Sequence, residues 1–65
     1  MVPSYTFVFF DAEGRKIDSA PSTCAGDVRA VVNAIHGMRE RPHCHAVEIA
    51  RDEKVLRRIE RAEVA

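Results

Sequence analysis

Apolar residues in the middle of the chain repeat at the spacing of an α-helix. Four of them stand at i, i+3, i+4 and i+7 and so share one helical face: Val28, Val31, Val32 and Ile35. Asp27 falls in the first turn, where the helix dipole favours a carboxylate, and Ser22 or Thr23 can cap the helix. Pro42 prevents continuation beyond about residue 40. The pattern therefore predicts a single helix of about 15 residues that starts near Cys24 and ends by about Glu40.

The residues before this helix alternate as a β-hairpin does. Residues 4–10 are aromatic and β-branched, which is typical of a strand, and both of their faces are apolar, which favours a central position. A turn follows at residues 11–14, with Gly14 able to adopt the positive φ of tight hairpins. Residues 15–20 then return as an edge strand with Ile17 inward, and residues 21–23 break it. Alternation divides the first strand into Tyr5, Phe7 and Phe9 on one face and Thr6, Val8 and Phe10 on the other.

The last third of the chain fits two structures. Residues 45–49 alternate as a strand, with Val47 and Ile49 on one face. Residues 51–54 can form a turn and residues 55–60 a fourth strand, yet the spacing of the apolar residues from Val55 to Ala62 also fits a helix rich in good helix formers. A loose internal similarity favours the hairpin, because both halves of the chain contain an apolar strand, an acidic turn and a second strand in the same order.

The layout also resembles a known group of proteins. Tyr5-x-Phe7 leads to Asp11-x-x-Gly14-Arg15, a helix follows, and His45-Ala46-Val47-Glu48-Ile49 and a charged turn precede Val55-Leu56. This is similar to short uncharacterised alphaproteobacterial proteins with the pattern Y-x-F-x-x-x-D-x-x-G-R, a short helix and H-x-V-E-V-W-x-x-x-x-L-V. The resemblance covers roughly residues 5 to 59, with Ala50 in place of the tryptophan. It implies the order ββαββ and no activity.

These elements predict one small α+β domain over residues 1–65. Its expected architecture is a two-layer ββαββ fold, in which one helix packs on one face of a mostly antiparallel four-stranded sheet. The expected core residues are Phe7, Phe9, Ile17, Val28, Val31, Val32, Ile35, Val47, Ile49 and Leu56.

Charge and hydrophobicity exclude several classes of function. Ten basic and ten acidic residues cancel, so the basic footprint of a nucleic-acid-binding protein is missing. No apolar run approaches the roughly 20 residues of a membrane span, and no signal peptide is evident. We therefore expect a cytoplasmic protein. The basic residues near the end are interleaved with acidic ones, which favours a solvated face: Arg51, Lys54, Arg57, Arg58 and Arg61.

Candidate chemical sites are sparse. His43 and His45 flank Cys44, and His36 near the helix end could join the two histidines as metal ligands, but solvated histidines at a strand entry are the better interpretation. Cys24 and Cys44 lie towards opposite ends of the helix, which argues against a disulfide. Cys24 has no base nearby and is expected to fill the seam between helix and sheet. We predict no enzyme activity, no cofactor, no metal and no small-molecule substrate.

One helix can cover only one face of the sheet, so the other face retains apolar side chains. Exposed apolar surface usually marks an interaction site. The sequence thus predicts a non-enzymatic interaction module that forms a homodimer or binds a larger protein. The alternative is a nucleic-acid-binding regulator that uses the sheet face and the C-terminal arginines. The predicted interface residues are Thr6, Val8, Phe10, Ala46, Val55 and Ile59.

Overall fold

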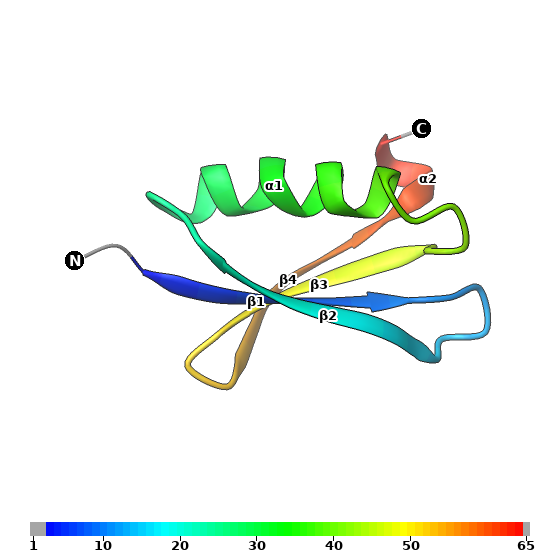
Figure 1. The fold of residues 1–65 in the computed structure, drawn as a ribbon, viewed down its shortest axis with the longest axis horizontal. Helices are drawn as coiled ribbons and strands as arrows, with labels where there is room; N and C mark the ends of the chain where they lie inside the picture. The colour runs from blue at the N-terminus through cyan, green and yellow to red at the C-terminus, as the bar shows by residue number, and fades with distance from the viewer. Residues whose placement is uncertain (1–2, 65) are drawn as a thin grey trace.

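The computed structural model describes residues 3–64, in which a long helix crosses one face of a four-stranded sheet (Figure 1). The predicted ββαββ order and α+β class are confirmed. The C-terminal residues that fit either a strand or a helix form a strand and then one turn of helix. In chain order the elements are β1 (Ser4–Phe10), β2 (Lys16–Thr23), α1 (Asp27–Arg39), β3 (Ala46–Arg51), β4 (Lys54–Glu60) and α2 (Arg61–Val64).

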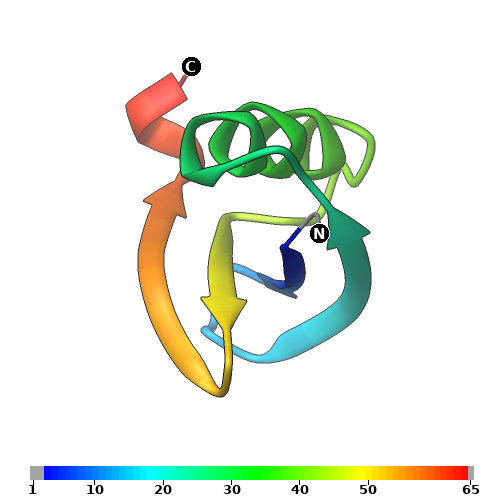
Figure 2. The ribbon, with the colours of Figure 1, turned by 90° about the vertical axis from the view of Figure 1, so that its left-hand side faces the viewer.

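The sheet has the order β2-β1-β3-β4, and every neighbouring pair is antiparallel. Strand β1 is central, as its two apolar faces predict, and β2 and β4 form the edges. The central pairing joins the two hairpins, with Phe10 opposite Ala46 and Thr6 opposite Ala50. Seen end on, the sheet curls so that both edges rise towards α1, which lies across the concave side (Figure 2).

The core lies between the concave face of the sheet and α1. Alternation along β1 is confirmed there, because Tyr5, Phe7 and Phe9 are all buried. Val47 and Ile49 of β3 are also buried, as predicted, and the pairing of Val47 with Ile59 brings the latter into the same layer.

The face of helix α1 that packs against the sheet differs from the face that the spacing of its valines predicts. Ala30, Ala34 and Met38, spaced four residues apart, are completely buried, whereas Val28 is 81% exposed. The prediction of Val28 as a core residue is therefore wrong. The neighbouring predicted residues lie at the margin of the buried stripe, where they are only partly buried: Val31, Val32 and Ile35.

Small residues allow α1 to approach the sheet closely. A Cβ atom added at Gly37 would lie 3.0 Å from Cζ of Phe9, so a side chain here would require the Phe9 ring to shift by a few tenths of an ångström. On the same ring, the guanidinium carbon of Arg41 lies 4.0 Å from the centroid. Arg41 also donates hydrogen bonds to Asp18 at 2.9 Å and to the carbonyl of Gly37 at 2.8 Å. Phe9 is thus held between the helix and an arginine that bridges to β2.

A bulge in the first hairpin displaces one predicted core residue. Phe9 pairs with Asp18 and Phe10 pairs with Lys16, so Ile17 has no partner on β1. A bulge bends its strand and changes the direction of its side chains. Ile17 is accordingly 43% exposed, and its predicted place in the core is wrong.

The second hairpin has the same kind of irregularity. Ile49 pairs with Arg57 and Ala50 pairs with Val55, which leaves Leu56 as the extra residue of β4. Leu56 is 47% exposed and not a core residue as predicted. Because two residues of β4 now oppose one of β3, the alternation of inward and outward positions shifts at this point.

The segment before α1 also differs from expectation. Strand β2 continues through Pro21, which pairs with Thr6, as far as Thr23. An edge strand tolerates proline because its outer side needs no hydrogen-bonding partner. Neither Ser22 nor Thr23 caps the helix; the N-cap is Gly26, which makes no side-chain capping bond.

The two hairpin turns contain the residues with positive φ. Gly14 has φ 81°, as the sequence predicts, and the N–H group of Gly14 donates to the carbonyl of Asp11. In the second turn Asp52 and Glu53 have φ 53° and 65°. Two consecutive residues in this region are typical of a two-residue hairpin loop, in which Asn-Gly is the preferred sequence.

The short helix α2 positions an arginine that joins three segments of backbone. Arg61 donates from Nε to the carbonyl of Cys44 at 2.6 Å, and from Nη2 to those of Met38 at 2.7 Å and Arg41 at 2.8 Å. These carbonyls belong to the end of α1 and to the loop that leads to β3. Val64 of α2 packs against the core beside them.

Candidate interaction surface

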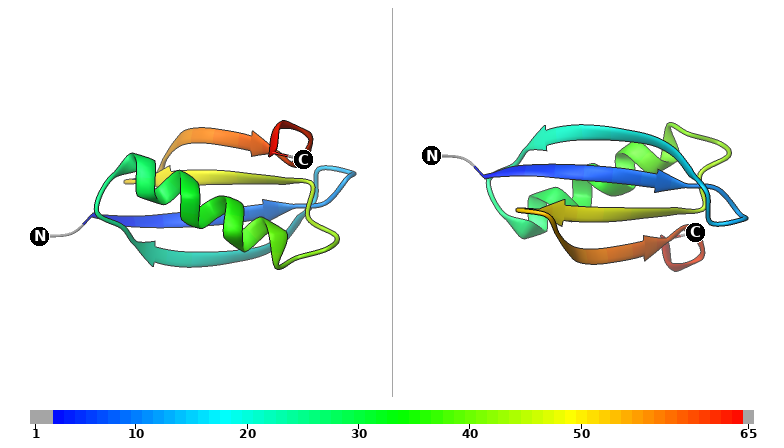
Figure 3. Two further views of the ribbon diagram at one scale, coloured as in Figure 1. Left: turned by 90° about the horizontal axis from the view of Figure 1, so that it is seen from above. Right: turned by 90° about the horizontal axis from the view of Figure 1, so that it is seen from below.

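Among residues 3–64, no helix lies over the convex face of the sheet (Figure 3, right). Pairing across the strands places five of the six predicted interface residues on this face: Thr6, Val8, Phe10, Ala46 and Val55. The assignment of Ile59 to this face is wrong, because its side chain is buried in the core on the concave side. Ala46 lies on the convex side but is itself buried, so it offers no contact area.

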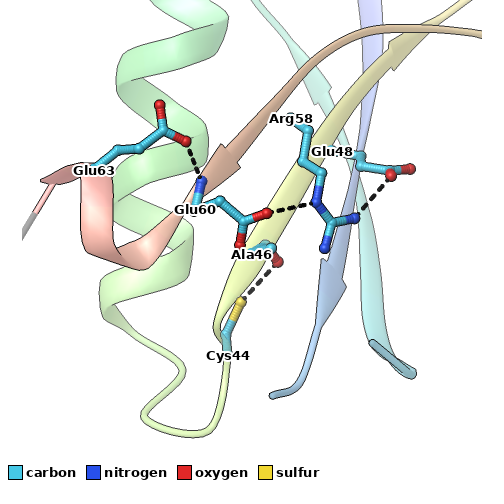
Figure 4. A network of polar contacts seen from close by, with 6 residues as sticks. All are labelled: Cys44, Ala46, Glu48, Arg58, Glu60 and Glu63. Carbon is cyan, nitrogen blue, oxygen red and sulfur yellow. Dashed lines mark hydrogen bonds and ion pairs between the residues drawn. The ribbon is translucent and has the colours of Figure 1, made fainter. Parts of the chain in front are cut away.

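One end of the convex face is covered by a charged network (Figure 4). Arg58 donates from Nη1 to Glu48 at 3.0 Å and from Nε to Glu60 at 2.9 Å. Its guanidinium carbon lies 5.1 Å from the centroid of the Phe10 ring. The sequence predicts Phe10 as an exposed contact residue. In the structure Arg58 lies over its ring, and Phe10 is only partly exposed.

Two local hydrogen bonds to the backbone lie near this network. The thiol of Cys44 donates to the carbonyl of Ala46 at 3.2 Å, and the N–H group of Glu60 donates to Glu63 at 2.8 Å (Figure 4). The second bond places the Glu63 carboxylate over the start of α2. The backbone next to the charged end of the convex face is thus held by hydrogen bonds within the chain.

The other end of the convex face is uncharged. Val55 is 57% exposed, and it is paired with Ala50, which in turn is paired with Thr6. Neighbouring positions on β2 carry small side chains opposite Thr6 and Val8. We call this surface the neutral patch, and it consists of Thr6, Val8, Ser19, Pro21, Ala50 and Val55.

A groove of about 270 Å³ lies on the concave side, between the first turns of α1 and strand β4. Buried Tyr5 and Ile49 form its floor, and exposed Val28 stands on its helix side. Because of the bulge, Leu56 and Arg57 both line the opposite side. We call this hollow the β4 groove. The sequence pattern does not predict this groove, because it places Val28 and Leu56 in the core.

A buried tyrosine and an aspartate close one end of the β4 groove. The hydroxyl of Tyr5 donates to Oδ1 of Asp27 at 2.6 Å, and this hydrogen bond raises the pKa of Tyr5 above its usual value. The guanidinium carbon of Arg51 lies 5.7 Å from the Tyr5 ring centroid. Both polar atoms thus have partners already, and the remaining groove wall is mainly apolar.

The other candidate chemistry does not assemble into a site. The three histidines proposed as possible ligands are exposed: His36, His43 and His45. Within residues 3–64, no three His, Cys, Asp or Glu side chains lie together in a way that could hold a metal ion. Cys24 is buried beside Ser22 and Asn33, whose polar atoms lie 3.3 and 3.5 Å from its sulfur.

Three of the five C-terminal basic residues are engaged within the chain. Arg58 is held by two carboxylates, Arg61 by three carbonyls, and Arg51 lies 3.8 Å from Asp52. The other two are Lys54 and Arg57. Neither belongs to an ion pair or a side-chain hydrogen bond among residues 3–64.

Comparisons with known proteins give no relative for this chain. No protein-family model, curated protein or solved structure matches it. The resemblance to the short alphaproteobacterial proteins stays a prediction. Among the described residues, no helix is long and apolar enough to cross a membrane.

Proposed function

We propose that this protein is a small non-enzymatic interaction module that binds a second copy of itself, or a larger protein, through the neutral patch. The observation that supports this proposal is the half-exposed central strand: β1 lies in the middle of the sheet, yet no second layer covers its convex side (Figure 3). A cytoplasmic location stays a prediction of the sequence.

The neutral patch has the properties of a contact surface. Its side chains are small and uncharged, so little desolvation opposes their burial, and each exposed valine that becomes buried contributes roughly 1–2 kcal/mol. The patch is bordered on one side by the Arg58 network, which supplies a polar rim. An apolar centre with a polar rim is the usual anatomy of an interface.

Val8 is the residue that we choose to change in a test of this interface. Phe10 is the choice that the sequence suggests, but its ring packs beneath Arg58, so changing it would also disturb the fold. Val8→Glu places a charge at the border of the neutral patch, opposite Glu48 on β3, so circular dichroism must verify that this variant stays folded. Lys16→Glu on the edge strand β2 is the control, because it introduces the same side chain at an exposed position outside the patch.

Size-exclusion chromatography with light scattering measures the outcome over a range of protein concentrations. We expect a wild-type dimer, a folded monomer for Val8→Glu, and a dimer for Lys16→Glu. A monomeric wild type at high concentration, together with no partner recovered in a pull-down, would contradict the proposal.

The alternative of a nucleic-acid-binding regulator has weaker support, since three of its five expected basic residues have partners within the chain. We expect weak or no binding to DNA and RNA at physiological salt. Sub-micromolar binding with a steep salt dependence would favour this alternative instead.

A further inference from the structure

We propose that strand β4 binds an extended acidic segment of a partner protein as a fifth strand of the sheet, with an apolar side chain of that segment seated in the β4 groove. The inference deepens the proposed interaction function and rests on it, but it concerns a different surface from the neutral patch.

The first argument concerns the two edges of the sheet. Both β2 and β4 are edge strands, and an edge presents N–H and C=O groups that an added strand can use. Pro21 interrupts β2, since proline lacks an N–H group. Strand β4, from Lys54 to Glu60, contains no proline. The β4 edge is therefore the better template.

The second argument is the apolar surface beside that edge. Val28 and Leu56 are large exposed apolar residues, and both line the β4 groove. Alternate side chains of a strand point to the same face, so a strand added to β4 would direct every second side chain towards α1. One apolar side chain in the groove would cover both residues and contact Ile49 on the floor.

The third argument is charge. Strand β4 carries three basic residues and one acidic residue, Glu60. Glu48 and Glu60 neutralise Arg58, while Lys54 and Arg57 have no carboxylate partner within residues 3–64. Arg57 lines the groove itself, and so does Asp27, whose carboxylate already accepts the hydrogen bond of Tyr5. Acidic residues in the added segment would supply the missing partners.

The same charges argue against a second copy of the chain at this edge. Antiparallel pairing of β4 with itself about its middle would bring two Arg57 side chains, or Arg57 and Arg58, directly opposite each other. Like charges in that position are destabilising. The bulge at Leu56 also bends the strand, which hinders pairing between two folded edges, whereas a flexible segment can follow it.

The experiment is a selection of random ten-residue peptides displayed on phage against the intact protein. Enriched peptides are synthesised with a fluorescent label, and their affinities are measured by fluorescence anisotropy. We expect enriched sequences that alternate apolar and acidic residues. Arg57→Glu and Val28→Lys should each weaken their binding at least about tenfold, which corresponds to about 1.4 kcal/mol. Lys16→Glu, on the β2 edge, should leave it unchanged.

Both test residues are exposed, so these variants should remain folded, and circular dichroism verifies this. Amide hydrogen exchange provides a second readout, because an added strand should slow exchange of β4 amides. Failure to enrich any peptide, or enriched peptides insensitive to both substitutions, would overturn the inference. Peptides that lose binding with Val8→Glu but not with Arg57→Glu would also overturn it, while supporting the neutral patch and the proposed function.

Discussion

Arg61 donates hydrogen bonds to three backbone carbonyls, and replacing it tests how much these bonds contribute to the stability of the fold. Arg61→Met keeps a long apolar side chain but removes every donor. Three carbonyls, at 2.6 to 2.8 Å, then lose a charged partner. They belong to the end of α1 and the following loop, so the change should loosen the connection between α1 and β3.

The expected loss follows from the number of bonds. A hydrogen bond to a charged group contributes about 1.5–3 kcal/mol. Arg61 is only half-buried, so water replaces part of what is lost, and we expect a total of about 3 kcal/mol. A domain of this size is stable by roughly 3–10 kcal/mol. At about 4–8 °C per kcal/mol, the melting temperature should fall by roughly 12–24 °C.

Thermal and urea denaturation followed by circular dichroism measure this loss. Arg61→Lys retains the charge but not the fork of donors, and we expect about half of the destabilisation. Arg57→Met is the matched control, because Arg57 is exposed and makes no ion pair within residues 3–64; it should change stability by less than about 0.5 kcal/mol. An Arg61→Met protein as stable as this control would refute the argument.

Three further predictions concern single positions. Gly37→Ala should destabilise the protein by about 1 kcal/mol in urea denaturation, despite the better helix propensity of alanine, because the new Cβ pushes the Phe9 ring against Arg41. A gain in stability would show that the ring moves freely. Glu53→Gly should stabilise by about 0.5–1 kcal/mol, since glycine adopts φ 65° without strain, and an unchanged urea midpoint would count against this. The hydrogen bond from Arg41 lowers the pKa of the Asp18 carboxyl group below its usual value of 3.8. The ionised carboxylate of Asp18 therefore stabilises the fold above pH 3.8, and this stabilisation is lost as the pH falls through the lower pKa of the folded protein. Between pH 4 and pH 2 the Asp18→Asn protein should therefore lose less stability than the wild type, and parallel pH profiles would exclude this role.

Periodicity along the chain predicts the elements and their order because each hairpin and the helix are local structures. The first strand is predicted to the residue, and Tyr5, Phe7 and Phe9 share the buried face that alternation predicts. The helix ends close to its predicted end, but it begins at Asp27 and not near Cys24. The fourth strand could not be decided by periodicity alone, and the layout of the first hairpin helped to assign it.

The errors in the predicted core arise where tertiary contacts override the local pattern. Ile17 and Leu56 are the unpaired residues of two bulges, and a bulge changes the alternation without any mark in the sequence. Val28 fails for a different reason. Two stripes of α1 are apolar, and the sheet packs against the one with alanines because small side chains permit closer approach.

The candidate surfaces were only partly predictable for the same reason. Thr6 and Val8 lie on the convex face as alternation along β1 predicts. On β4 the bulge at Leu56 shifts the alternation, so that Val55 lies on the convex face and Ile59 in the core. The cover over Phe10 depends on the pairing of Glu48 with Arg58, which requires the register of β3 and β4. The β4 groove depends on the bulge and on the helix phase, and neither can be derived from residue spacing.

The pairing of β1 with β3 also determines how the chain can fold. Each hairpin closes over a few residues, whereas Phe10 meets Ala46 across more than half of the chain. Closing such a large loop costs entropy before any central contact forms, so the hairpins can form early but gain little by themselves. Docking of the two hairpins beneath α1 is then the slow, cooperative step, and the folding rate is set by the middle of the sheet rather than by its turns.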